Sequence, residues 1–247
     1  MRFISGLLAA ASVASVCASN PNVTDSALKI AGEARSLWHA HAATVGDYAA
    51  AVASDNLPLA NAVKPYALAV APNMTQWLSN WYGDKQDSLN QFQTLFTDHI
   101  KTLAGIVDAT KANNETQAAE LKQHLADGGQ QLAGVIESLN PAAYPKEAVL
   151  PLLSDHENLA VAAGALLIAQ KWDEGYATAI TGFEQSELIA DALAKGVLAL
   201  TSAVAPPATA GASIPANGQA PMSAASTLVS TTRWMVAPLI VAAITLM

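Results

Sequence analysis

Cysteine, aromatic residues and charge are all scarce in this chain of 247 residues. A single cysteine excludes a disulfide-stapled scaffold, and a charged fraction of 13% excludes a disordered polyelectrolyte. Acidic residues outnumber basic ones, 20 to 12, which gives a net charge of -8. A nucleic-acid-binding protein needs a basic surface to neutralise phosphates, so we expect no nucleic-acid partner. No glycine-rich loop precedes a lysine in the pattern of a phosphate-binding loop, so we expect no nucleotide partner either.

What the chain does have is hydrophobic residues, which make up 52% of it, in patterns typical of helices. Strand signals are almost absent. Asn114 and Gln117 form a capping-box-like pair that predicts the start of one long helix. Asn56-Leu57-Pro58 predicts a break, followed by a short helical insert at about residues 59–71 and a second piece after Pro72. We therefore expect an all-α domain over residues 19–200, an antiparallel up-down bundle of four long helices plus a short helical insert.

Both ends of the chain have the pattern of processing signals. Residues 1–18 read as a secretory signal peptide, in which Arg2 precedes an apolar run and cleavage follows Ala18. A lipoprotein signal at Cys17 is the weaker alternative, because Val16 fits poorly before a lipidated cysteine. Residues 224–247 end in an apolar run that follows a polar spacer and small residues, as in a GPI-attachment signal. We expect attachment at Ser223, with Asn217 as a second candidate site; a short tail anchor is the alternative.

Residues 201–223 are rich in proline, alanine, serine and glycine, which predicts an extended stalk. Asn22, Asn73 and Asn114 each begin an N-glycosylation sequon. These features together predict a glycoprotein held by a GPI lipid at the extracellular face of the plasma membrane or in the cell wall. The expected partners are the membrane, through that lipid, and cell-wall components.

Three of the five histidines fall within apolar helical stripes and are expected in the core: His41, His99 and His156. Each is near the middle of its predicted helix, and mid-helix positions of an up-down bundle fall in one layer. His39 and His124 lie off the stripes and are expected at the surface. The last predicted helix brings Glu187 and Asp191 to a similar height. Imidazoles and a carboxylate in one layer are a ligand set for Zn²⁺, Cu²⁺ or Fe²⁺.

Two other interpretations of the histidine layer stay open: a structural polar layer that fixes helix register, and a small-ligand pocket. The pattern Glu-x-x-His of di-iron bundles is absent, as are His-Glu-x-x-His and Gly-x-Ser-x-Gly. Asp98, Asp155 and Glu157 stand beside core histidines in the sequence, and we expect them at the rim because neighbours on a helix do not share a face. Gly128-Gly129 predicts close packing or a local kink.

Short motifs in this chain resemble those of a secreted or surface helical-bundle family known mostly from bacilli and other bacteria, some members of which are labelled as kinases. The matching segments span about residues 36–197: Leu37-Trp38-x-x-His41, Trp81-Tyr82-Gly83-Asp84, Leu95-Phe96-Thr97-Asp98-His99-Ile100, Asn140-Pro141, Asp155-His156 and Ala190-Asp191-Ala192-Leu193. The resemblance implies a helical bundle and, since it includes all three core histidines, a shared site. The chain departs from the family after His41, where Thr44-Val45-Gly46 replaces a Trp-Thr-Arg run, so any role of that arginine would be lost. The resemblance implies no activity.

We expect a non-catalytic surface or cell-wall glycoprotein whose bundle core has the ligands to hold a transition metal, with the structural layer and the small-ligand pocket still open. A metal-dependent enzyme that uses Asp191 or Glu187 as general base is the first alternative. An adhesion or interaction module that acts through an outer face is the second.

Overall fold

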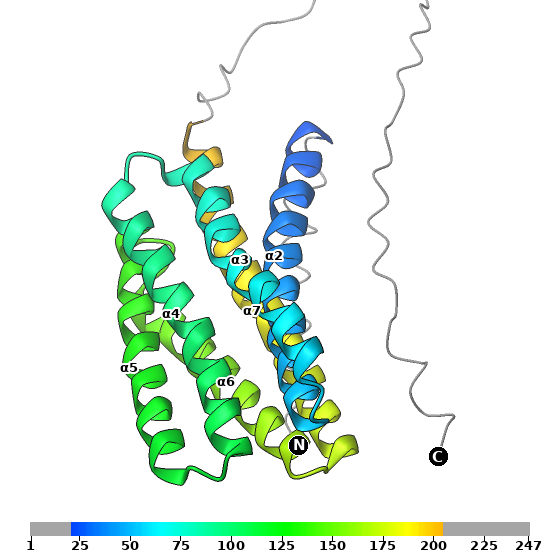
Figure 1. The fold of residues 1–247 in the computed structure, drawn as a ribbon. Coiled ribbons are helices and arrows are strands. Elements are labelled where there is room, and N and C mark those ends of the chain that lie inside the picture. The colour runs from blue at the N-terminus through cyan, green and yellow to red at the C-terminus, as the bar shows by residue number, and fades with distance from the viewer. Residues whose placement is uncertain (1–20, 205–247) are drawn as a thin grey trace, which may run out of the picture. The chain divides into compact units, whose positions relative to one another are not determined.

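The computed structural model describes residues 21–204, and side chains within residues 25–201. This part of the chain is all-α (Figure 1). It consists of six helices: α2 (Pro21–Ala53), α3 (Leu57–Tyr82), α4 (Gln86–Lys111), α5 (Glu115–Leu139), α6 (Lys146–Ile168) and α7 (Trp172–Val204). The predicted signal peptide, the GPI signal with Ser223, Asn217 and nearly all of the stalk lie outside the described residues. No helix within residues 21–204 is both long and apolar enough to cross a membrane.

The all-helical prediction is confirmed, but the count of four long helices plus a short insert is not. The expected insert is one helix of 26 residues, α3, which continues through Pro65 and Pro72. A proline inside a helix costs about 3 kcal/mol, mainly through a lost hydrogen bond and a steric clash. Both prolines are exposed, whereas the opposite face of α3 buries Met74, Trp77 and Leu78. Burial of that face therefore keeps α3 helical where the local signals predict a break.

The six helices form three successive hairpins, α2–α3, α4–α5 and α6–α7, and consecutive helices alternate in direction (Figure 1). The turns inside the three hairpins are alike. Two residues after the last residue of each first helix stands a left-handed residue, Asp55, Asn113 or Gln170, with φ of 58°, 54° and 59°. The amide of the next residue donates to a carbonyl five residues back, as Asn114 does to Ala109 at 2.9 Å. This is the pairing of a Schellman cap, which satisfies the free carbonyls at a helix end.

Side-by-side contacts link each helix to the next, and α7 also contacts α2, which closes the arrangement. The three first helices, α2, α4 and α6, also contact one another, so they meet inside the bundle. Large residues between them are almost fully buried, among them Trp38, Phe92, Phe96 and Leu153.

A buried pair of tyrosines holds together one part of this core. The Tyr82 hydroxyl donates to the Tyr144 hydroxyl at 2.8 Å, and Tyr144 donates in turn to the Leu193 carbonyl at 2.7 Å. Gly196 lies so close that an added Cβ would overlap the Tyr144 ring. The buried hydroxyls thus have the partners that burial requires.

Candidate metal centre

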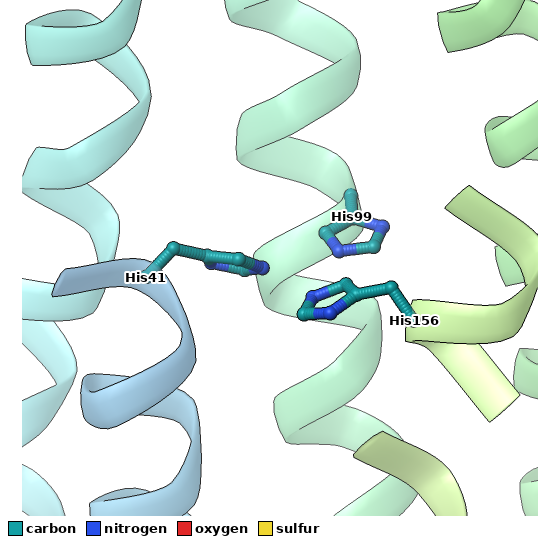
Figure 2. Close-up of side chains that lie close together, drawn as sticks. All are labelled: His41, His99 and His156. Atoms are coloured by element: carbon teal, nitrogen blue, oxygen red, sulfur yellow. The ribbon is translucent and has the colours of Figure 1, made fainter. Parts of the chain in front are cut away.

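The three histidines predicted in the core lie together at the centre of the bundle. His41 comes from α2, His99 from α4 and His156 from α6, and their imidazoles point toward one another (Figure 2). Their exposed fractions are 0%, 6% and 4%. The core location predicted for the three side chains is confirmed.

The three histidines lie at the same level along the bundle because the turns that follow α2, α4 and α6 have the same geometry. Each histidine lies fourteen residues before the left-handed residue that follows its helix: 41 before 55, 99 before 113 and 156 before 170. An α-helix rises 1.5 Å per residue, so each histidine lies about 21 Å from its cap. The three helices run in the same direction and touch one another. Since each histidine is equally far from the cap of its helix, the three imidazoles lie in one layer.

The three rings are spaced so that a metal ion could bind all of them once the ring nitrogens move somewhat closer together. One nitrogen from each imidazole can be chosen so that all three lie within 4.8 Å of one another. The ring centroids are 5.4 Å apart for His41 and each partner, and 6.5 Å apart for His99 and His156. Bonds of 2.0–2.1 Å at tetrahedral angles would bring the nitrogens to about 3.3 Å from one another. Each imidazole turns about two side-chain torsions, which are enough to close a gap of this size.

The ring nitrogens have almost no partners. Both nitrogens of His41, both of His99 and Nδ1 of His156 are buried without a hydrogen bond. A buried polar group without a partner costs about 1–3 kcal/mol, and most buried polar atoms in folded proteins have one. Five such nitrogens in one place are therefore an unusual accumulation. A metal ion would give one nitrogen of each ring a ligand bond at once.

Two neighbouring groups favour particular ring orientations. The backbone of Gly182 lies near enough to the His156 ring to raise its pKa, and Nδ1 of His156 has no hydrogen-bond partner. Oε1 of Glu157 lies 3.3 Å from Nδ1 of His99, close enough for an ion pair but without hydrogen-bond geometry. A small rotation of His99 would let Nδ1–H donate to Glu157 and turn Nε2 toward the other histidines. Metal-ligating histidines in proteins generally donate their second N–H to such a carbonyl or carboxylate.

Glu157 corrects one expectation from the sequence, because it is 5% exposed and does not lie at the rim. The reason is α5, which covers this side of α6. A Cβ at Gly129 of α5 would stand 2.7 Å from Oε1 of Glu157, so only glycine leaves room for the carboxylate there. Close packing at Gly128-Gly129 is confirmed at the second glycine, whereas a Cβ at Gly128 would meet nothing within 4 Å.

Burial keeps the imidazoles of His41 and His156 neutral. The pKa of His41 lies well below its ordinary value, first because burial disfavours the cation and then because His156 and His99 would repel it. Burial and His99 likewise lower the pKa of His156 to about 4, against an opposing effect of the Gly182 backbone. Neutral imidazole is the form that binds metals, so little proton loss would accompany binding.

The other two predicted ligands are engaged elsewhere. Glu187 lies 2.9 Å from Nε2 of His39, and Asp191 makes two 2.7 Å hydrogen bonds with Arg35. All four side chains are about one third to one half exposed, on the outer side of the contact between α2 and α7. The structure does not bring Glu187 or Asp191 to the three histidines. His124, as expected, is at the surface, 2.7 Å from Asp98.

Comparison of the chain with protein-family models, with curated proteins and with solved structures found no match in any of the three.

Proposed function

We propose that the helical bundle binds one divalent transition-metal ion through His41, His99 and His156. The observation that supports this most directly is a cluster of three buried imidazoles from different helices, with five unpaired ring nitrogens and with one nitrogen of each ring within 4.8 Å of the others. Glu157 and the Gly182 backbone would act as positioning groups for His99 and His156. We name this set of three histidines the His triad.

A purely structural polar layer would account for the same burial less well. Such a layer stabilises a core when its hydrogen bonds are satisfied, and the Tyr82–Tyr144–Leu193 chain in this bundle has that property. The His triad lacks it, because its members make no hydrogen bonds with one another.

Zn²⁺, Cu²⁺ and Fe²⁺ are the ions that this donor set favours. Imidazole suits all three, whereas Mg²⁺ and Ca²⁺ prefer oxygen ligands. Three neutral imidazoles supply no negative charge, so the Glu157 carboxylate beside His99 would balance part of the charge of the ion. Three nitrogen ligands from the protein are also the set found in zinc sites that keep one coordination position open.

A chelator-competition titration with Zn²⁺ tests the proposal. We expect the purified full-length chain to bind one ion per molecule, and His41→Ala/His99→Ala/His156→Ala to lose that ion while remaining helical by circular dichroism. The matched control is His39→Ala, which changes a histidine on α2 whose partner is Glu187. Equal binding by wild type and triple variant would reject the His triad as the site.

The setting of this site would be the cell surface. The signal peptide at residues 1–18, the sequons at Asn22, Asn73 and Asn114, the stalk at 201–223 and the GPI signal with Ser223 support that proposal. Asn73 and Asn114 are exposed, as a glycan requires. Release of the protein from intact cells by a phosphatidylinositol-specific phospholipase is the expected result. Retention after that treatment would argue for a protein tail as the anchor.

A metal-dependent enzyme is the second candidate, because three protein ligands leave a position for water or substrate. The general base could not be Glu187 or Asp191, which pair with His39 and Arg35 outside the triad. Zinc-dependent hydrolysis of an activated ester, lost in His41→Ala and kept in His39→Ala, would support this candidate.

A further inference from the structure

A cavity of about 50 Å³ lies directly beside the His triad. Its walls come from α2, α4, α6 and α7, and His156 is the one lining residue with a polar side chain. One water needs about 10–15 Å³ of such space, so the cavity is several times larger than a single water requires. An apolar cavity of this kind holds water poorly, which makes it suitable for an apolar occupant.

The helix register places this cavity on one particular side of the triad. Val45, Leu103 and Ala160 line it, and each lies four residues after the histidine of its own helix. Ala49, Val107 and Gly164 line it as well, each eight residues after its histidine. The cavity therefore begins one helical turn from the triad and extends toward the C-terminal ends of α2, α4 and α6.

The opposite side of the triad is filled. Trp38, Phe96 and Leu153 each lie three residues before a histidine and are at most 2% exposed. The Trp38 ring centroid is 5.8 Å from that of His41 and 5.9 Å from that of His156. Phe96 is 5.0 Å from His41 and 5.6 Å from His99 by the same measure. These aromatic rings leave no room there for a fourth ligand to the metal.

We infer that the fourth coordination position of the metal faces this cavity, and that its occupant is a small neutral molecule with one donor atom and an apolar chain of a few carbon atoms. The inference rests on the proposed metal site. The donor atom would bind the metal and the chain would lie between Val45, Leu103 and Ala160. A charged molecule is excluded because no lining side chain other than His156 could pair with its charge.

A substitution at Gly46 can fill the cavity without changing any of the three metal-ligating histidines. It lines the cavity within α2, and an added Cβ would meet nothing within 4 Å. A valine at this position would project into open space and occupy it. Gly32 is the matched control, since it is also a glycine of α2, its Cβ would also meet nothing within 4 Å, and it is exposed and outside the cavity.

The test uses the full-length protein loaded with Co²⁺, whose visible spectrum changes when the fourth ligand changes. The probes are straight-chain primary amides from acetamide to hexanamide, which stay neutral and offer a carbonyl oxygen to the metal, with cobalt content measured after each titration. We expect affinity to rise about fourfold for each added methylene until the cavity is full, and to fall beyond that length. Gly46→Val should bind Co²⁺ as wild type does but lose the rise with chain length, whereas Gly32→Val should keep it.

The possible results distinguish failure of the cavity ligand from failure of the metal site. Absence of Co²⁺ binding by wild type would reject the metal site, and the cavity ligand with it. Normal Co²⁺ binding with affinities that do not depend on chain length would reject the cavity ligand alone. The same rejection would follow if Gly46→Val kept the dependence on chain length.

Discussion

Oε1 of Glu157 lies 3.3 Å from Nδ1 of His99, and both side chains are about 95% buried. An acid and a histidine so placed form one half of the carboxylate–histidine–metal arrangement that orients metal ligands in proteins. The other half would be the ion itself, on Nε2 of the same ring. This relationship between residues of α6 and α4 is the basis of the first two predictions.

Glu157→Gln should weaken Zn²⁺ binding by about 10- to 100-fold while leaving the stoichiometry at one ion. The amide can still accept a hydrogen bond from His99, but it no longer supplies negative charge near the ion. Chelator competition measures the affinity, and Asp155→Asn, an exposed acid-to-amide change two residues away, is the control. An unchanged affinity in Glu157→Gln, or an equal loss in Asp155→Asn, would show that Glu157 does not position His99.

Gly129→Ala should weaken Zn²⁺ binding through Glu157. The added methyl group would stand 2.7 Å from Oε1 and 2.9 Å from Oε2, so the carboxylate must move. Gly128→Ala meets no atom and should stabilise α5 by up to about 1 kcal/mol without changing metal affinity. In a Glu157→Gln background, Gly129→Ala should cause little further loss, because both changes act on one contact. If the losses of Zn²⁺ affinity in the two variants were fully additive, Gly129→Ala would not act through Glu157.

The stability of the metal-free protein should fall as pH drops from about 6.5 toward 4. The pKa of His156 is lowered to about 4 in the folded state, against 6.5 in a model peptide, so the unfolded state binds more protons in that window. His156 alone would account for a loss of about 3 kcal/mol, and His41 should add to it. Urea unfolding at several pH values measures this loss, and it should shrink in His156→Gln. A flat profile in the wild type would contradict a neutral, buried imidazole at His156 and at His41.

Gly196→Ala should destabilise the fold and leave metal binding unchanged. Its Cβ would overlap the Tyr144 ring, which is 1% exposed and donates to the Leu193 carbonyl. Overpacking of this kind costs about 1–3 kcal/mol. Thermal unfolding would report that loss, while Zn²⁺ affinity measured well below the unfolding temperature should match wild type. A parallel loss of affinity would indicate that the tyrosine pair and the His triad are coupled.

The sequence was sufficient to predict the helical class and the three core histidines, because apolar periodicity reports which face of a helix is buried. The start of α5 was also predictable, since the Asn114 side chain accepts the Gln117 amide at 3.2 Å as its cap pattern indicates. The sequence also contains a stronger indication that the three histidines lie in one layer, which the helix-by-helix reading did not use. The spacing from His41 to His99 nearly equals that from His99 to His156, and each histidine has the same distance to its helix end.

Other features depend on tertiary contacts that local patterns do not contain. The path of α3 through Pro65 and Pro72 requires the buried face that only the folded bundle provides. The positions of Glu187 and Asp191 are set by His39 and Arg35, partners 148 and 156 residues away. Glu157 is buried because Gly129 of α5 leaves room for it, and no pattern within α6 reports that contact.

X-ray absorption at the zinc edge of the zinc-loaded full-length protein would show whether the three histidines bind the ion, because it counts the imidazoles bound to the metal. We expect three imidazole nitrogens at about 2.0–2.1 Å and one further light atom. The His41→Ala variant should lose this signature and His39→Ala should keep it. A zinc ion surrounded mainly by oxygen, or a wild-type spectrum unchanged in His41→Ala, would contradict a metal centre built from His41, His99 and His156.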